Sequence, residues 1–140
     1  MNITEGNWDA LSSRLLPYRD ELKSLREVAG YRGSQDSIKL AFDESIRTRA
    51  QQVADKRQGT KLVVVIGIGG SNLGTKAVYE ALGLPVRMEF IDTVDPLTIN
   101  RVWAIMSLYR SHEVVVCAVS KSGQTAETIT NTEIILERMK

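Results

Sequence analysis

The sequence predicts an α/β fold, in which helices cover both faces of a parallel sheet and two further helices precede it. Two continuous apolar runs, LVVVI at 62–66 and VVVCAV at 114–119, are typical of strands buried on both faces. A third run, RMEFI at 87–91, alternates polar and apolar residues and predicts a half-exposed strand. Helical spacing fills the intervening stretches, so right-handed crossovers make the three strands parallel.

The first third of the chain predicts two helices. Apolar residues recur there at steps of three and four, at Trp8, Leu11, Leu15, Tyr18, Leu22, Leu25 and Ala29. Pro17 lies inside this pattern and is expected to kink or split the helix. After Gly33, Ser34 or Asp36 is expected to cap a second helix. Its apolar face would carry Ile38, Phe42, Ile46, Ala50 and Val53. Residues 1–58 are therefore expected to form an N-terminal helical segment, followed by an α/β domain at 59–140.

Three helices are predicted to alternate with the strands. The first runs from about Asn72 and ends at Gly83, and the second begins at Asp95 and Pro96, a good pair for a helix N-terminus. The last extends from Thr125 to Lys140. The alternating strand belongs at an edge and the apolar strands inside, which favours the strand order 2-1-3. The crevice between strands 1 and 3 is then a topological switch point, where ligands bind in such sheets.

Two loops rich in small and hydroxyl residues open at that crevice. GIGGSNLG at 67–74 follows strand 1, and its glycines let a ligand approach the backbone. SKSGQTAET at 120–128 follows strand 3 and leads into a helix. Hydroxyl groups and backbone amides at a helix N-terminus form a receptor for phosphate, to which Lys121 could add a charge. The sequence therefore predicts one phosphate-binding site built from two loops.

Two nucleotide motifs come close to matching the first loop. A dinucleotide fingerprint needs glycine where Asn72 stands, although Asp92 lies about where a ribose-binding acid would. A dinucleotide-binding fold thus remains an alternative. A Walker-type phosphate loop fails because Thr75 precedes Lys76, the reverse of the required order.

Composition limits the possible partners. Lys and Arg number 18 against 17 Asp and Glu, so no charge excess favours nucleic acid or a membrane surface. The chain starts without a secretory signal pattern and has no apolar stretch of membrane-spanning length, which makes the cytoplasm the expected compartment. The one cysteine, Cys117, excludes an intrachain disulfide or a cysteine-rich metal site.

The two loops together resemble the N-terminal sugar isomerase (SIS) domain of the phosphoglucose isomerase family, whose strand order is of the flavodoxin-like kind. The family carries G-I-G-G-S-x-L-G after its first SIS strand, matched at 67–74, and S-K-[ST]-x-x-T-x-E after its third, matched at 120–127. The segment FIDTVDP at 90–96 is also similar. Two correctly spaced motifs in one frame are far more specific than either alone.

The resemblance implies a function and a set of ligands for it. Ser120, Lys121, Ser122 and Thr125 would hold the phosphate of a sugar phosphate, and Gly70 and Ser71 would line its sugar end. The reaction would be the glycolytic and gluconeogenic interconversion of glucose 6-phosphate and fructose 6-phosphate through a cis-enediol, without metal or cofactor. The family's glutamate base, histidine, lysine and arginine come from later in the chain.

The sequence departs from the family there. His112, the single histidine, precedes strand 3 and does not match the catalytic position, and Glu127 matches a motif residue rather than the base. The 140 residues are therefore expected to form an incomplete SIS domain, a fragment that grips phosphate but is inactive alone. A self-contained, non-catalytic phosphosugar-binding module is the alternative. The apolar third strand has an open edge, so a homo-oligomer or association through that edge is expected.

Overall fold

The computed structural model describes residues 5–140, so the first four residues of the predicted helical segment lie outside the described residues. The chain divides into two compact units, one up to Lys56 and one from Arg57 to Lys140. Each unit is described by itself. Within residues 5–140, no helix combines the length and the apolar character that crossing a membrane requires.

The first unit differs from the sequence-based expectation in how its helices are divided. Helix α1 (Glu5–Leu25) continues through Pro17 and is not split there. The predicted second helix is instead two elements, the 3-10 helix η1 (Ser34–Phe42) and the α-helix α2 (Glu44–Asp55). The carboxylate of Asp43 accepts hydrogen bonds from the N–H groups of Ser45 (2.9 Å) and Ile46 (3.4 Å). Asp43, a residue well suited to cap a helix, thus starts α2.

Asp36 does not cap an α-helix but closes the turn before η1. Its buried carboxylate accepts from the N–H groups of Arg32 (2.6 Å) and Gly33 (2.8 Å) and forms an ion pair with Lys39 (2.7 Å). The ammonium of Lys39 also donates to the carbonyls of Val28 and Gly30. These contacts stabilise the ionised form, with the bond to Lys39 first among them, and lower the pKa of Asp36 to about 2.

The second unit contains the predicted parallel sheet. Its strands are β1 (Leu62–Ile66), β2 (Arg87–Ile91) and β3 (Val114–Ala118), and their order is β2-β1-β3. Ile66, the last residue of β1, is in register with Ile91 on one side and Ala118 on the other. The fold class and the strand order predicted from the sequence are therefore confirmed.

The helices of this unit begin and end close to their predicted bounds. They are α3 (Leu73–Leu82), α4 (Pro96–Met106) and α5 (Ala126–Arg138), with 3-10 turns η2 (Gly69–Ser71) and η3 (Ser111–Glu113) before α3 and β3. Asp95 caps α4 as predicted, because its carboxylate accepts from the N–H groups of Leu97 (3.2 Å) and Thr98 (2.8 Å). The Thr98 hydroxyl and these N–H groups lower the pKa of Asp95.

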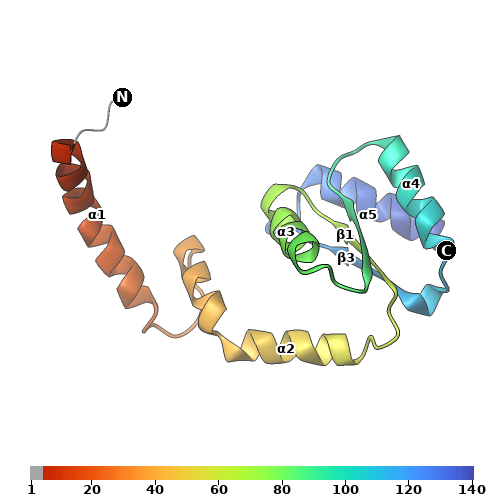
Figure 1. The fold of residues 1–140 in the computed structure, drawn as a ribbon, viewed down its shortest axis with the longest axis horizontal. Coiled ribbons are helices and arrows are strands. Elements are labelled where there is room, and N and C mark those ends of the chain that lie inside the picture. The colour runs from red at the N-terminus through yellow and green to blue at the C-terminus, as the bar shows by residue number, and fades with distance from the viewer. Residues whose placement is uncertain (1–4) are drawn as a thin grey trace. The chain divides into compact units, whose positions relative to one another are not determined.

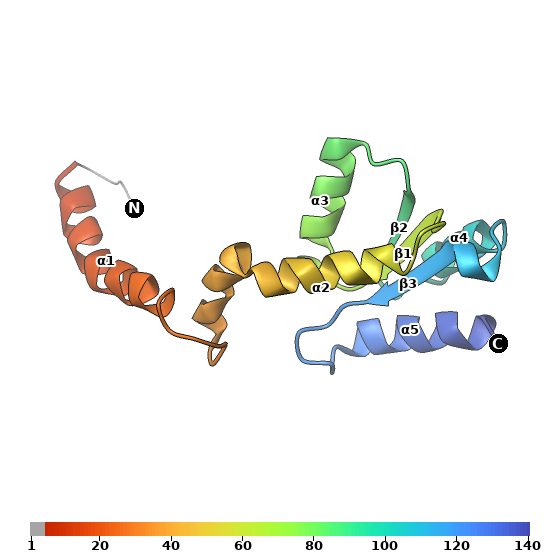
Figure 2. The ribbon, with the colours of Figure 1, turned by 90° about the horizontal axis from the view of Figure 1, so that it is seen from below.

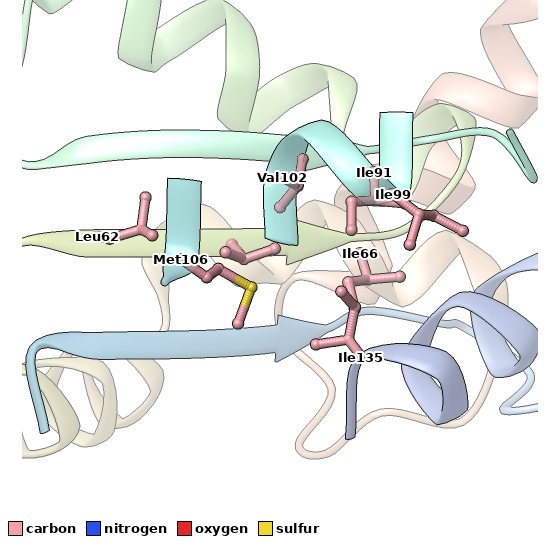
Figure 3. Packing of buried hydrophobic residues seen from close by; sticks show 8 residues of the cluster. Leu62, Ile66, Ile91, Ile99, Val102, Met106 and Ile135 are labelled. Atoms are coloured by element: carbon pink, nitrogen blue, oxygen red, sulfur yellow. The ribbon is translucent and has the colours of Figure 1, made fainter. Parts of the chain in front are cut away.

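The core of the second unit lies between the sheet and the helices α4 and α5 (Figure 3). Every second residue of β1 points into it, and it consists of Leu62, Val64, Ile66, Ile91, Ile99, Val102, Met106 and Ile135. On the other face, the ring of Tyr79 in α3 lies 6.3 Å from that of Phe90, which pairs with Val65. Helices α3 and α5 therefore lie on opposite sides of the sheet, as Figures 1 and 2 show.

The third strand is less buried than its composition predicts. Val114, Val115, Val116 and Cys117 are half-buried, and Ala118 is exposed. Within the described residues, β3 pairs with β1 along one edge only. The sequence predicts that both continuous apolar strands are buried on both faces. This prediction is confirmed for β1 but is wrong for β3.

Candidate functional site

The two predicted loops leave neighbouring strands at the same end of the sheet. The N–H of Val119 donates to the carbonyl of Ile66 over 2.8 Å, which extends the β1–β3 ladder one residue beyond β3. The N–H of Gly67 donates to the carbonyl of Ile91 over 3.1 Å. The loops that follow β1 and β3 therefore start side by side, at the switch point that the sequence predicts.

Gly67 lets the first loop approach the second closely. A Cβ at this position would lie 3.0 Å from the carbonyl oxygen of Val119 and 3.0 Å from the Cβ of Ser71. One of these neighbours is backbone and is itself held in the ladder through its N–H. A side chain at position 67 would thus push the two loops apart.

The first loop is a tight turn with an open outer side. The N–H of Ser71 donates to the carbonyl of Ile68, and that of Asn72 to the carbonyl of Gly69, both over 3.1 Å. Gly69 has a φ of +57°, which an L-residue rarely adopts. A Cβ on Gly69 or Gly70 would have nothing within 4 Å. Of the two predicted sugar-binding residues, Gly70 is exposed and Ser71 half-buried; their role stays a prediction.

Hydroxyl groups hold the other loop, at 120–128, together. The Oγ of Ser120 accepts from the N–H of Gly123 (3.0 Å) and lies 3.2 Å from the Oγ1 of Thr125. The Oγ of Ser122 accepts from the N–H of Gln124 (3.1 Å). Three of the predicted phosphate ligands thus belong to one hydrogen-bonded loop. The fourth, Lys121, is exposed; the role of all four stays a prediction.

The start of α5 adds the favourable end of a helix to this loop. Thr125 occupies the N-cap position, but its side chain makes no capping hydrogen bond. Its hydroxyl faces Ser120 instead, so the cap does not occupy the first N–H groups of α5. Hydroxyl donors, amides and the positive end of a helix are what an anionic oxygen requires. The loop has the chemistry of an oxyanion site, with an exposed cation in Lys121.

Sequence reasoning missed two buried amides at this end of the sheet. Asn131, on the buried face of α5, donates from its Nδ2 to the carbonyl of Thr93 over 3.0 Å and so ties α5 to the loop after β2. Asn72 is 1% exposed at the start of α3. Asn131 could have been found as a polar residue at helical spacing between Thr128 and Ile135, the other buried residues of α5. No such signal marks Asn72, because asparagine before a helix is typical of an ordinary N-cap.

The remaining candidates lie where the sequence suggests. His112 is exposed in η3, just before β3 and therefore at the opposite end of that strand from the loops. Asp92 is exposed directly after β2, while Asp95 caps α4. None of these three residues belongs to either loop of the candidate site.

Comparison with known proteins agrees with both motifs. The family model for phosphoglucose isomerase matches residues 18–140. A glucose-6-phosphate isomerase of Methanocaldococcus jannaschii is 39% identical over 83 residues, covering 59% of this chain and 20% of the relative. One of Acholeplasma laidlawii is 27% identical over 127 residues, covering 84% of this chain and 30% of the relative. One of Desulfotalea psychrophila is 44% identical over 73 residues, covering 49% of this chain and 13% of the relative.

The match is broad for this chain but partial for its relatives. The chain spans less than a third of the length of the curated relatives it matches. No solved structure matches it significantly. Because the family model covers well over half of the chain, including both loops and all three described strands, this chain belongs to the phosphoglucose isomerase family.

Proposed function

We propose that this chain supplies the sugar-phosphate grip of a glucose-6-phosphate isomerase. The observation that carries the proposal is the joint start of the two family loops, where the N–H of Val119 binds the carbonyl of Ile66. In this proposal Ser120, Ser122 and Thr125 donate their hydroxyl protons to the phosphate. The amide and the ammonium of Lys121 contribute further.

Ser120 and Ser122 can bind phosphate without losing the N–H groups that they now accept from. Ser120 and Ser122 now accept from N–H groups of their own loop, and an accepting hydroxyl still has its proton to donate. The loop is therefore already folded when the phosphate arrives, which lowers the entropic cost of binding. Gly70 and Ser71 lie on the adjacent loop and would meet the sugar end.

The reaction that we propose is the conversion of an aldose phosphate to the corresponding ketose phosphate. A base removes the proton from C2, a cis-enediol forms, and a proton returns to C1 as O1 gains and O2 loses a proton. C1 is reduced as C2 is oxidised, so the two sugars are isomers and no external oxidant or cofactor enters the balance. The base and the ring-opening residues come, in this proposal, from outside these 140 residues.

Three further proposals follow from the same assignment. Residues 59–140 are the N-terminal part of a SIS domain, and a helical segment, which the structure describes over residues 5–58, precedes them in the sequence. The edge of β3 that has no partner among the described residues takes another strand, either from the remainder of a longer chain or from a second copy. The expected compartment is the cytoplasm.

Binding by the isolated chain tests the proposal. We expect weak binding of glucose 6-phosphate and fructose 6-phosphate, competed by inorganic phosphate, with amide shifts at residues 120–126 in NMR spectra. Ser120→Ala and Ser122→Ala should weaken binding of inorganic phosphate. Ser107→Ala, an exposed serine at the end of α4, is the matched control.

Each alternative has its own outcome in that experiment. No phosphate binding by the wild-type chain would refute the proposal. Shifts at residues 67–74 on titration with NAD instead would favour a dinucleotide-binding fold. Measurable isomerisation by the isolated chain would refute the assignment of the acid–base residues to other segments.

A further inference from the structure

Asn72 carries a buried carboxamide that makes no hydrogen bond to the described part of the chain. Its side chain is 1% exposed, and neither Oδ1 nor Nδ2 has a hydrogen-bond partner within the part of the chain that the structure describes. Buried polar groups are nearly always paired, and an amide left unpaired raises the free energy of the state that contains it. An apolar residue of the same size would avoid this cost.

The ordinary role of asparagine at this position is also missing. Asn72 occupies the N-cap of α3, where its side chain would normally accept from a backbone N–H of the first turn. No such bond is made, and its φ and ψ of −132° and −31° are not the usual extended values of a cap. The amide therefore neither caps α3 nor forms a hydrogen bond with the described residues around it.

Asn72 borders the turn at 68–71 of the first loop. Its own N–H and carbonyl are fixed by bonds to the carbonyl of Gly69 (3.1 Å) and the N–H of Lys76 (2.9 Å). At the other end, Gly67 packs against Val119. Between these two points, Gly69 and Gly70 face open space. The turn at 68–71 is thus a short glycine-containing bridge between two fixed residues.

We propose that Asn72 is a positioning residue, whose carboxamide gains hydrogen bonds from the backbone of the 68–71 turn when a sugar phosphate is bound. The inference rests on the proposed function, in which Gly70 and Ser71 meet the sugar. In the ligand-free chain the unpaired amide destabilises the turn, and its pairing in the complex favours the bound arrangement. Asn72 then contributes to affinity for the sugar but not for the phosphate.

The substitution Asn72→Leu separates this role from a structural one. It removes the two unpaired polar atoms and keeps the branching at Cγ, but leucine is larger than asparagine and crowds a buried site. The melting temperature of the ligand-free chain should therefore fall less than it does when a paired buried amide is replaced in the same way. The Kd of inorganic phosphate should not change. The Kd of glucose 6-phosphate should increase about fivefold to thirtyfold, the loss of one to two ordinary hydrogen bonds. The ratio of the two Kd values is the decisive measurement.

Asn131→Leu is the matched control. Asn131 is also a buried amide, but it already donates to the carbonyl of Thr93, so its replacement should lower the melting temperature and leave the ratio of Kd values unchanged. A melting temperature for Asn72→Leu as low as that for Asn131→Leu would show that the amide supports the ligand-free fold and would overturn the inference. So would an unchanged ratio, or an equal change of ratio in Asn131→Leu. If the wild-type chain binds neither ligand, the proposed function fails and this inference fails with it.

Discussion

The carbonyl oxygen of Val119 lies 3.0 Å from the position that a Cβ on Gly67 would occupy. This approach joins the two loops of the candidate site at their first residues. Gly67→Ala should therefore destabilise the second unit by about 1–3 kcal/mol, because the backbone of Val119 must move to admit the methyl group. Urea unfolding of the two proteins measures the difference.

Gly74→Ala provides the control for that measurement. Gly74 lies in α3, where a Cβ would meet nothing within 4 Å. Alanine should keep or raise stability there, by up to about 1 kcal/mol. Equal unfolding midpoints for Gly67→Ala and the wild type would show that the loops do not depend on this contact.

Removal of the cap at Asp95 should shorten or loosen α4. Asp95→Ala loses two hydrogen bonds to backbone N–H groups and should cost about 1 kcal/mol of stability. Asp92→Ala, three residues earlier and exposed, should change stability by less than about 0.5 kcal/mol. Thermal unfolding followed by circular dichroism compares the pair, and equal losses for both would contradict the capping role.

The first unit should lose stability in acid through Asp36. Its pKa is lowered from 3.8 to about 2, so the folded state holds the carboxylate in its ionised form. The stabilisation is complete above pH 3.8 and is lost as the pH falls toward 2. Asp43 titrates in the same window, since the Ser45 hydroxyl and the Tyr31 hydroxyl lower its pKa to about 2.

Carboxyl chemical shifts followed by NMR between about pH 5 and pH 1 test that assignment. Lys39→Met removes the strongest partner of Asp36 and should raise the pKa of this carboxyl while leaving that of Asp43 low. A pKa of Asp36 that does not respond to Lys39→Met would show that the two backbone N–H groups alone determine it.

The edge of β3 should cause self-association of the isolated chain. Val119 directs its N–H toward β1, and strand alternation then directs the N–H of Ala118 toward the unpaired edge. Ala118→Pro removes this donor without a bond to β1 and should reduce association. Light scattering at increasing concentration measures the association. Ala104→Pro, in the last turn of α4, is a comparison variant that should unfold rather than dissociate. A monodisperse wild-type monomer would favour a self-contained module.

Much of the second unit could be predicted from the pattern of apolar residues. Continuous and alternating runs have different periods from helices, and they indicated the bounds of β1 and β2 and the strand order. The burial of β3 could not be predicted, because it depends on which segments pack against the strand. The amino acids of the strand itself do not indicate those segments. The break at Asp43 was missed because the helical spacing of apolar residues continues across it, although the side chain bonds to the backbone there.

The candidate site divides in the same way. Its loops were recognisable because each begins where a continuous apolar run changes to small and hydroxyl residues. The hydrogen bonds within the loop at 120–128 depend on the exact turn at Gly123, whose φ is +69°. The burial of Asn72 was not visible at all, since asparagine before a helix indicates a cap in any sequence.

The bond between Asn131 and Thr93 has one partner in a side chain and the other in the main chain. A main-chain carbonyl is present whichever amino acid stands at position 93, whereas only an amide-bearing residue can donate from position 131 in this geometry. Replacement libraries of the two positions should therefore be asymmetric: position 93 should accept many residues, and position 131 very few.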